Sequence, residues 1–117
     1  MEIKKVVVIG SGTMGSGIAA HLCNAGVPVT LLDLTTEISK KARERIHKSR
    51  PPLLIDKSTI NNINVGNIEE NFDVVKDADW VVEAVVERID IKHNIYEKIF
   101  KNRKKGAIVS SNTSSIP

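Results

Sequence analysis

Residues 6–19, VVVIGSGTMGSGIA, decide the interpretation of this chain, because an apolar run is followed by four glycines within eight positions. Glycine loses more backbone freedom on folding than any other residue, so a cluster of glycines needs a structural reason. Gly10, Gly12 and Gly15 form the pattern G-x-G-x-x-G between a predicted buried strand and a predicted helix. There the first glycine permits a tight turn, the second lets the backbone approach a pyrophosphate, and the third lets the helix pack closely on the sheet.

An acidic residue follows this turn at a suitable distance. Asp33 ends the next predicted strand, 18 residues after Gly15. A carboxylate at this position accepts hydrogen bonds from a ribose 2′-hydroxyl and repels a 2′-phosphate. Residues 34–39, LTTEIS, contain no arginine that could bind such a phosphate. We therefore expect NAD rather than NADP, while a purely structural glycine turn, a flavin site and an S-adenosylmethionine site remain alternatives.

The rest of the chain alternates between predicted strands and helices. We expect strands over 4–9, 27–33, 80–86 and 107–111, and helices over 14–25, 37–49 and 91–102, the last capped by Asp90. Segment 53–72 predicts at most a short helix and a short strand, and 73–78 one or two helical turns. This order predicts a single α/β domain over 1–117, a doubly wound Rossmann-like parallel sheet. Ligands of such sheets bind beyond the carboxyl ends of the strands, here the loops at 10–15, 33–36, 84–92 and 110–115.

Composition excludes several other classes of protein. Hydrophobic residues make up 41% of the chain and aromatic residues 3%, so the core must be aliphatic. The net charge of +3 comes largely from KNRKK at 101–105, which we interpret as a solvated helix end rather than a nucleic-acid surface. Cys23 is the single cysteine, which excludes an internal disulfide and favours a small core residue. No apolar segment reaches transmembrane length, so we expect a soluble protein, and the single cysteine fits a reducing, cytoplasmic setting.

The expected ligand edge of the sheet carries further polar residues. Glu83, Glu87 and Lys92 lie near the end of the strand predicted over 80–86, and residues 110–115, SSNTSS, follow the last strand. The hydroxyl and amide groups of SSNTSS could orient a nicotinamide or a substrate carbonyl, but an ordinary helix cap or turn explains them equally well. For Glu87 and Lys92, five residues apart, the residues alone favour a surface pair. His21, His47 and His93 are each expected to be structural or solvated rather than proton donors, and no cluster has metal-ligand spacing.

Three stretches resemble the NAD-binding domain of 3-hydroxyacyl-CoA dehydrogenases: residues 6–22, residues 81–92 (VVEAVVERIDIK) and residues 109–117 (VSSNTSSIP). Segment 48–88 resembles the bacterial long-chain type, in which an enoyl-CoA hydratase region follows the dehydrogenase. The resemblance implies hydride transfer between C3 of (S)-3-hydroxyacyl-CoA and NAD, giving 3-ketoacyl-CoA in fatty-acid β-oxidation. It implies that Ser114 helps to bind the substrate's 3-oxygen and the cofactor, and that the remaining cofactor contacts come from Gly10, Gly12, Thr13, Met14, Gly15, Asp33, Val85, Val86, Glu87 and Lys92.

One departure from this family is large. Its catalytic histidine follows the serine that matches Ser114 in a further strand, a glutamate orients that histidine, and a helical C-terminal domain completes the acyl pocket. Residues 1–117 contain none of these, so we expect a fragment that lacks the last strand of the sheet, binds NAD and turns over poorly. The parent protein would be a homo-oligomer acting on acyl-CoA. A non-enzymatic dinucleotide-binding module and a β-hydroxyacid dehydrogenase remain alternatives.

Overall fold

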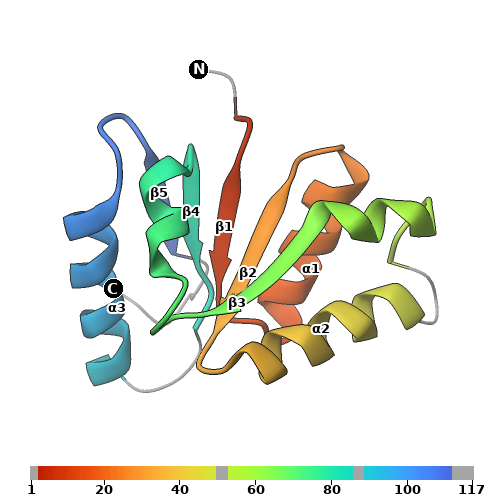
Figure 1. The fold of residues 1–117 in the computed structure, drawn as a ribbon, viewed down its shortest axis with the longest axis horizontal. Helices are drawn as coiled ribbons and strands as arrows, with labels where there is room; N and C mark the ends of the chain where they lie inside the picture. The colour runs from red at the N-terminus through yellow and green to blue at the C-terminus, as the bar shows by residue number, and fades with distance from the viewer. Residues whose placement is uncertain (1–2, 50–52, 86–88, 112–117) are drawn as a thin grey trace.

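The computed structural model describes residues 3–49, 53–85 and 89–111, with the backbone alone for 89–92. Its centre is a parallel sheet of five strands in the order β3-β2-β1-β4-β5, covered by helices on both faces (Figure 1). The elements along the chain are β1 (Val6–Ile9), α1 (Thr13–Asn24), β2 (Val29–Asp33), α2 (Thr36–Lys48), the 3-10 helix η1 (Lys57–Asn62), β3 (Ile63–Asn67), the 3-10 helix η2 (Phe72–Asp77), β4 (Trp80–Glu83), α3 (Ile89–Asn102) and β5 (Ile108–Ser111). The predicted doubly wound parallel sheet is confirmed.

Strand β1 lies at the centre of the sheet and is buried on both faces. Val6 and Val8 pack into one apolar cluster, whereas Val7 and Ile9 pack into another on the opposite face. This alternation follows from the two-residue period of a strand. A run of four β-branched residues therefore fills both cores at once, as expected for a central parallel strand.

The two faces of the sheet are covered by different helices. Helices α1 and α2 lie on one face, and α3 with η2 lies on the other (Figure 1). Ala19, Ala20 and Cys23 bring α1 close to the first face, and the burial of Cys23 confirms it as a core residue. Ile95 and Ile99, four residues apart, bury one side of α3 against the second face. The connections between consecutive parallel strands thus place the helices that complete both cores.

Segment 53–72, the hardest to interpret from sequence, supplies the edge strand β3. Its strand INVGN pairs with β2 from Ile63 opposite Val29 to Asn67 opposite Asp33. Helix α2 supports this strand through Arg43, whose Nε donates to the carbonyl of Ile63 at 2.8 Å. Side-chain contacts from another element therefore hold a strand whose own sequence is polar and contains glycine.

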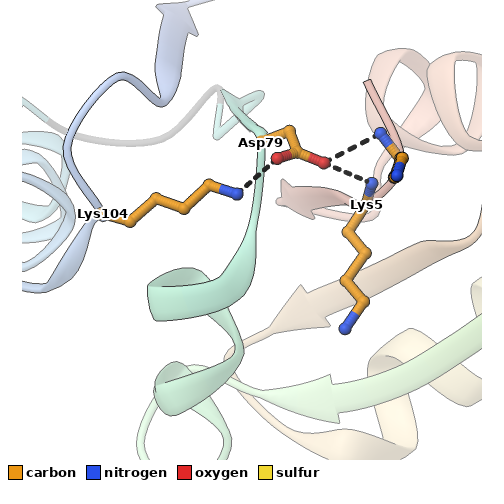
Figure 2. A network of polar contacts seen from close by, with 4 residues as sticks. Lys5, Asp79 and Lys104 are labelled. Carbon is orange, nitrogen blue, oxygen red and sulfur yellow. Dashed lines mark hydrogen bonds and ion pairs between the residues drawn. The ribbon is translucent and has the colours of Figure 1, made fainter. Parts of the chain in front are cut away.

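The amino-terminal edge of the sheet is closed by Asp79, the residue before β4. Its carboxylate accepts hydrogen bonds from the backbone N–H groups of Lys4, at 2.8 Å, and Lys5, at 3.0 Å, and pairs with the ammonium of Lys104 (Figure 2). These contacts, with Lys104 as the largest cause, lower the pKa of Asp79 from 3.8 to about 2. The backbone N–H groups of Lys4 and Lys5 thus bind the Asp79 side chain, while the Lys5 carbonyl accepts hydrogen bonds from the N–H groups of Asp79 and Trp80. The regular strand β1 begins at Val6 and not at residue 4 as predicted.

Other boundaries also differ from the predictions. Helix α3 begins at Ile89, so Asp90 lies within the helix and is not its N-cap. Strand β4 ends at Glu83 rather than at residue 86. Next to it, β5 is held to β4 by the indole of Trp80, which donates to Ser110 Oγ at 2.8 Å. No helix in the described ranges is both long and apolar enough to cross a membrane.

Candidate dinucleotide-binding site

The glycine turn after β1 is fixed by two close approaches of main chain. Gly10 has a φ of +106°, and a Cβ there would lie 2.8 Å from the carbonyl carbon of Ala84 in the neighbouring loop. A Cβ on Gly15 would lie 1.8 Å from the carbonyl oxygen of Gly10, far inside van der Waals contact. These two glycines therefore have the structural roles predicted for them: one makes the turn and the other lets α1 pack against it.

Gly12 differs from both because its surroundings are open. It is the N-cap of α1, and a Cβ added to it would meet no protein atom within 4 Å. Because Gly12 has no side chain, it cannot cap the helix with a side-chain hydrogen bond, and the first turn of α1 contains no acidic residue. The first N–H groups of a helix carry a partial positive charge and lack partners within the helix. The end of α1 thus offers accessible backbone and a positive potential, which suit an anionic group such as a phosphate.

Asp33 lies at the end of β2, directly beside this turn. Its Oδ2 accepts hydrogen bonds from the N–H and the hydroxyl of Ser11, at 2.7 and 2.5 Å, and its Oδ1 accepts one from the N–H of Leu34 at 2.7 Å. Sequence analysis assigned this carboxylate to a ribose; the structure shows that it also holds the glycine turn. Ser11 is almost fully buried, so the contact fixes the acid relative to the N-terminus of α1.

A pocket of about 480 Å³ joins these features at the carboxyl ends of the strands. It lies where the connections after β1 and β4 lead to opposite faces of the sheet, the usual ligand site of this architecture. The volume suits part of a small organic ligand. Its walls come from the glycine turn, the ends of β2 to β4 and three helices, namely Gly10, Ser11, Gly12, Thr13, Met14, Asp33, Leu34, Ile38, Arg45, Ile68, Ala84, Val85 and Ile95.

Several of these residues escaped sequence analysis. Leu34 and Ile38 are exposed apolar side chains next to Asp33, and they give that end of the pocket a hydrophobic wall. Arg45 reaches the same region from α2, with its Nη2 donating to the carbonyl of Ser11 at 3.1 Å. Residues 34–39 contain no arginine, as sequence analysis stated, but α2 brings one to the same pocket from twelve residues beyond Asp33. The sequence signal for Arg45 was its spacing: it lies seven residues after Ile38, which places both on the same face of the predicted helix.

Glu83 is buried at the end of β4 and connects two loops of the expected ligand edge. Its Oε2 accepts a hydrogen bond from the N–H of Val85 at 2.5 Å, and its Oε1 accepts one from the hydroxyl of Ser111 at 3.1 Å. Val85 lines the pocket, while its contact with the cofactor stays a prediction, and Ser111 ends β5. Glu83 thus sets the position of the main chain that leads toward Glu87 and of the strand that leads toward Ser114.

The remaining predicted site residues lie outside what the structure describes. Val86, Glu87 and Ser114 fall in undescribed segments, and the backbone of Lys92 is placed in α3 without its side chain. Their assignments stay predictions. The three histidines, at positions 21, 47 and 93, are all exposed and none lines the pocket.

The strand order, the uncapped glycine turn and the acid at the end of β2 define a dinucleotide-binding domain of the Rossmann type. The sequence profile of one family, described as 3-hydroxyacyl-CoA dehydrogenase, NAD binding domain, matches residues 5–117. The chain belongs to this family, whose domain binds NAD, and the resemblance noted from the three motifs is confirmed.

Named relatives agree with this assignment. The chain is 47% identical to a probable 3-hydroxyacyl-CoA dehydrogenase of Deinococcus radiodurans, covering 100% of this chain and 36% of that protein. It is 46% identical to a putative fatty acid oxidation complex trifunctional enzyme of Rickettsia felis, covering 99% of this chain and 17% of that protein. The crystal structure of FadB2 of M. tuberculosis superposes with a TM-score of 0.87 at 30% identity, over 100% of this chain and 43% of that one. The chain thus spans less than half the length of each of these proteins.

Proposed function

We propose that this chain binds NAD with the pyrophosphate over the N-terminus of α1 and the adenosine ribose at Asp33, as the cofactor domain of a 3-hydroxyacyl-CoA dehydrogenase. The observation that carries the proposal is the open space at Gly12. It is the one glycine of the motif at which an added Cβ would meet no protein atom, and it lies at an uncapped helix N-terminus in the same pocket as Asp33.

The residues present fit the cofactor at three points. Backbone N–H groups at the start of α1 would hold the phosphates, with Thr13 and Met14 along the path toward the nicotinamide. Asp33 has further acceptor capacity on its two oxygens beyond the contacts with Ser11 and Leu34, and would bind ribose hydroxyls. Leu34 and Ile38 would pack against the adenine. Together these contacts would anchor the adenosine half and orient the other half toward Val85.

When bound, NAD supplies the hydride acceptor for oxidation of a 3-hydroxyacyl-CoA to a 3-ketoacyl-CoA. This substrate class rests on the family and on relatives named for fatty acid oxidation. In this proposal Val86, Glu87 and Lys92 lie near the nicotinamide, and Ser114 orients the substrate oxygen and the cofactor. Glu83 would position both segments through its bonds to Val85 and Ser111. Self-association of the parent protein and a cytoplasmic location belong to the same proposal.

Calorimetric titration of the chain with NADH tests the binding site directly. Gly12→Ala should weaken NADH about tenfold or more, because the added methyl occupies the space of the phosphates. It should change the free energy of unfolding by less than about 1 kcal/mol, because the free protein has room for it. Gly17→Ala is the matched control on the same helix: its Cβ also meets open space, but Gly17 does not line the pocket.

Equal NADH affinity in the wild type and in Gly12→Ala, with both proteins folded, would contradict this placement of the pyrophosphate. A folded wild-type chain that binds neither NADH nor NADPH would contradict the proposed function as a whole. Turnover of acetoacetyl-CoA by a longer parent protein separates the dehydrogenase from a module that only binds the dinucleotide.

A further inference from the structure

The pocket contains a cation that the proposed function does not use. Arg45 lines it from α2 and donates through Nη2 to the carbonyl of Ser11, whose own N–H and hydroxyl bind the carboxylate of Asp33. One buried residue thus connects the guanidinium with the acid that is expected to bind the ribose. The Arg45 side chain is exposed, and a guanidinium carries five N–H donors, of which the contact with Ser11 occupies one.

We propose that Arg45 determines cofactor specificity by binding a phosphate at the ribose 2′ position, so that this chain binds NADPH as well as NADH. The inference rests on the proposed placement of the adenosine at Asp33. It concerns the 2′ position only and leaves the pyrophosphate contacts at Gly12 unchanged.

Two opposite charges, on Arg45 and Asp33, line the same pocket, and each side chain contacts Ser11. The carboxylate of Asp33 favours a free 2′-hydroxyl and repels a 2′-phosphate. A guanidinium binds a phosphate through charge-assisted and frequently bidentate hydrogen bonds, which are stronger than neutral ones. Arg45 and Ile38 lie seven residues apart on one face of α2, and this face lines the pocket. The repulsion from Asp33 is therefore offset within the pocket itself.

A purely structural role for Arg45 makes a different prediction. If the guanidinium only holds the glycine turn through the Ser11 carbonyl, its removal should weaken every ligand that uses the turn to the same degree. If it binds the 2′-phosphate, its removal should weaken only ligands that carry this group. The two roles are separated by comparing ligands with and without the 2′-phosphate.

Isothermal titration of the chain with NADH, NADPH, 5′-AMP and adenosine 2′,5′-bisphosphate makes this comparison. We expect Arg45→Ala to weaken NADPH and the bisphosphate about tenfold or more, and NADH and AMP less than about threefold. Arg45→Lys keeps the positive charge but loses the bidentate geometry of the guanidinium, so it should bind NADPH more tightly than Arg45→Ala and less tightly than the wild type. Lys41→Ala removes one charge from the same helix outside this pocket. It should leave unchanged the affinity for NADPH relative to NADH and for the bisphosphate relative to AMP.

Each other outcome overturns the inference. Equal losses for NADH and NADPH in Arg45→Ala would assign Arg45 to the glycine turn alone. A wild-type chain that binds NADH and shows no NADPH binding would refute the inference and leave the proposed function intact. A folded wild-type chain that binds no dinucleotide would refute both.

Discussion

Main chain at each end of strand β1 is bound by an aspartate carboxylate, but the surroundings of the two aspartates differ. At the amino end, Asp79 accepts hydrogen bonds from the N–H groups of Lys4 and Lys5 and pairs with Lys104. At the carboxyl end, Asp33 accepts hydrogen bonds from the N–H and the hydroxyl of Ser11. In both cases an aspartate at one end of a neighbouring strand, directly before β4 or at the end of β2, holds main chain adjoining β1. The carboxylate alone therefore does not distinguish a binding site from a structural contact.

What distinguishes the ends is the space beside each aspartate. At the amino end, the ammonium of Lys104 and two backbone N–H groups already occupy the carboxylate of Asp79 (Figure 2). At the carboxyl end, glycines replace side chains, and a pocket of about 480 Å³ opens between Asp33 and the N-terminus of α1. In this chain a lysine completes the pairing of Asp79, whereas Asp33 lies beside uncovered main chain in a pocket, which supports the ligand site proposed there.

The largest effect is expected from Gly15→Ala, at the carboxyl end. The added methyl would lie 1.8 Å from the Gly10 carbonyl oxygen, and backbone on both sides must move to admit it. We expect a loss of at least about 3 kcal/mol in the free energy of unfolding, measured by urea denaturation. In Gly17→Ala, on the same helix with open space at the Cβ, stability should be unchanged or raised by up to about 1 kcal/mol. Similar stabilities for both variants would contradict the close packing of the turn.

Asp33→Ala should have the next largest effect, on binding. We expect NADH affinity to fall by about 1–3 kcal/mol in calorimetric titration, because ribose hydroxyls lose their acceptor and Ser11 loses its partner. Asp73→Ala is the control: it removes the same charge from an exposed side chain outside the pocket. Unchanged NADH affinity in Asp33→Ala would assign this aspartate, like Asp79, to structure alone.

Asp79→Asn should affect stability in a pH-dependent manner and leave NADH binding unchanged. Because the folded pKa of Asp79 is lowered from 3.8 to about 2, the ionised group stabilises the fold above about pH 4, and this contribution is lost as the pH falls toward 2. The wild type should therefore melt at a higher temperature than the variant at pH 7, with a difference that shrinks below pH 4. A difference that stays constant from pH 7 to pH 3 would contradict the lowered pKa.

The features that sequence analysis predicted correctly depend on neighbouring residues. The glycine turn, Asp33 at the end of a strand and the apolar run of β1 each follow from local spacing and period. The features it missed depend on contacts between distant segments. Arg45 reaches the pocket only because α2 packs beside β3, and the strand INVGN forms because β2 and Arg43 bind it.

The boundary errors have the same origin. The strand predicted from residue 4 is shortened because Lys4 and Lys5 bind Asp79, 75 and 74 residues away in sequence. Asp90 was interpreted as a cap from its residue type alone, whereas α3 starts before it. Residue preference at a helix end does not fix the end itself when nearby residues are equally able to be helical.

The hydrogen bond between Trp80 and Ser110 has a practical consequence. Trp80 is the only tryptophan of the chain, and its indole joins β4 to the last described strand. Intrinsic fluorescence excited at this residue therefore reports separation of these two strands without an added label. Because indole emission overlaps nicotinamide absorption, quenching of the same emission by energy transfer gives an optical titration of NADH binding.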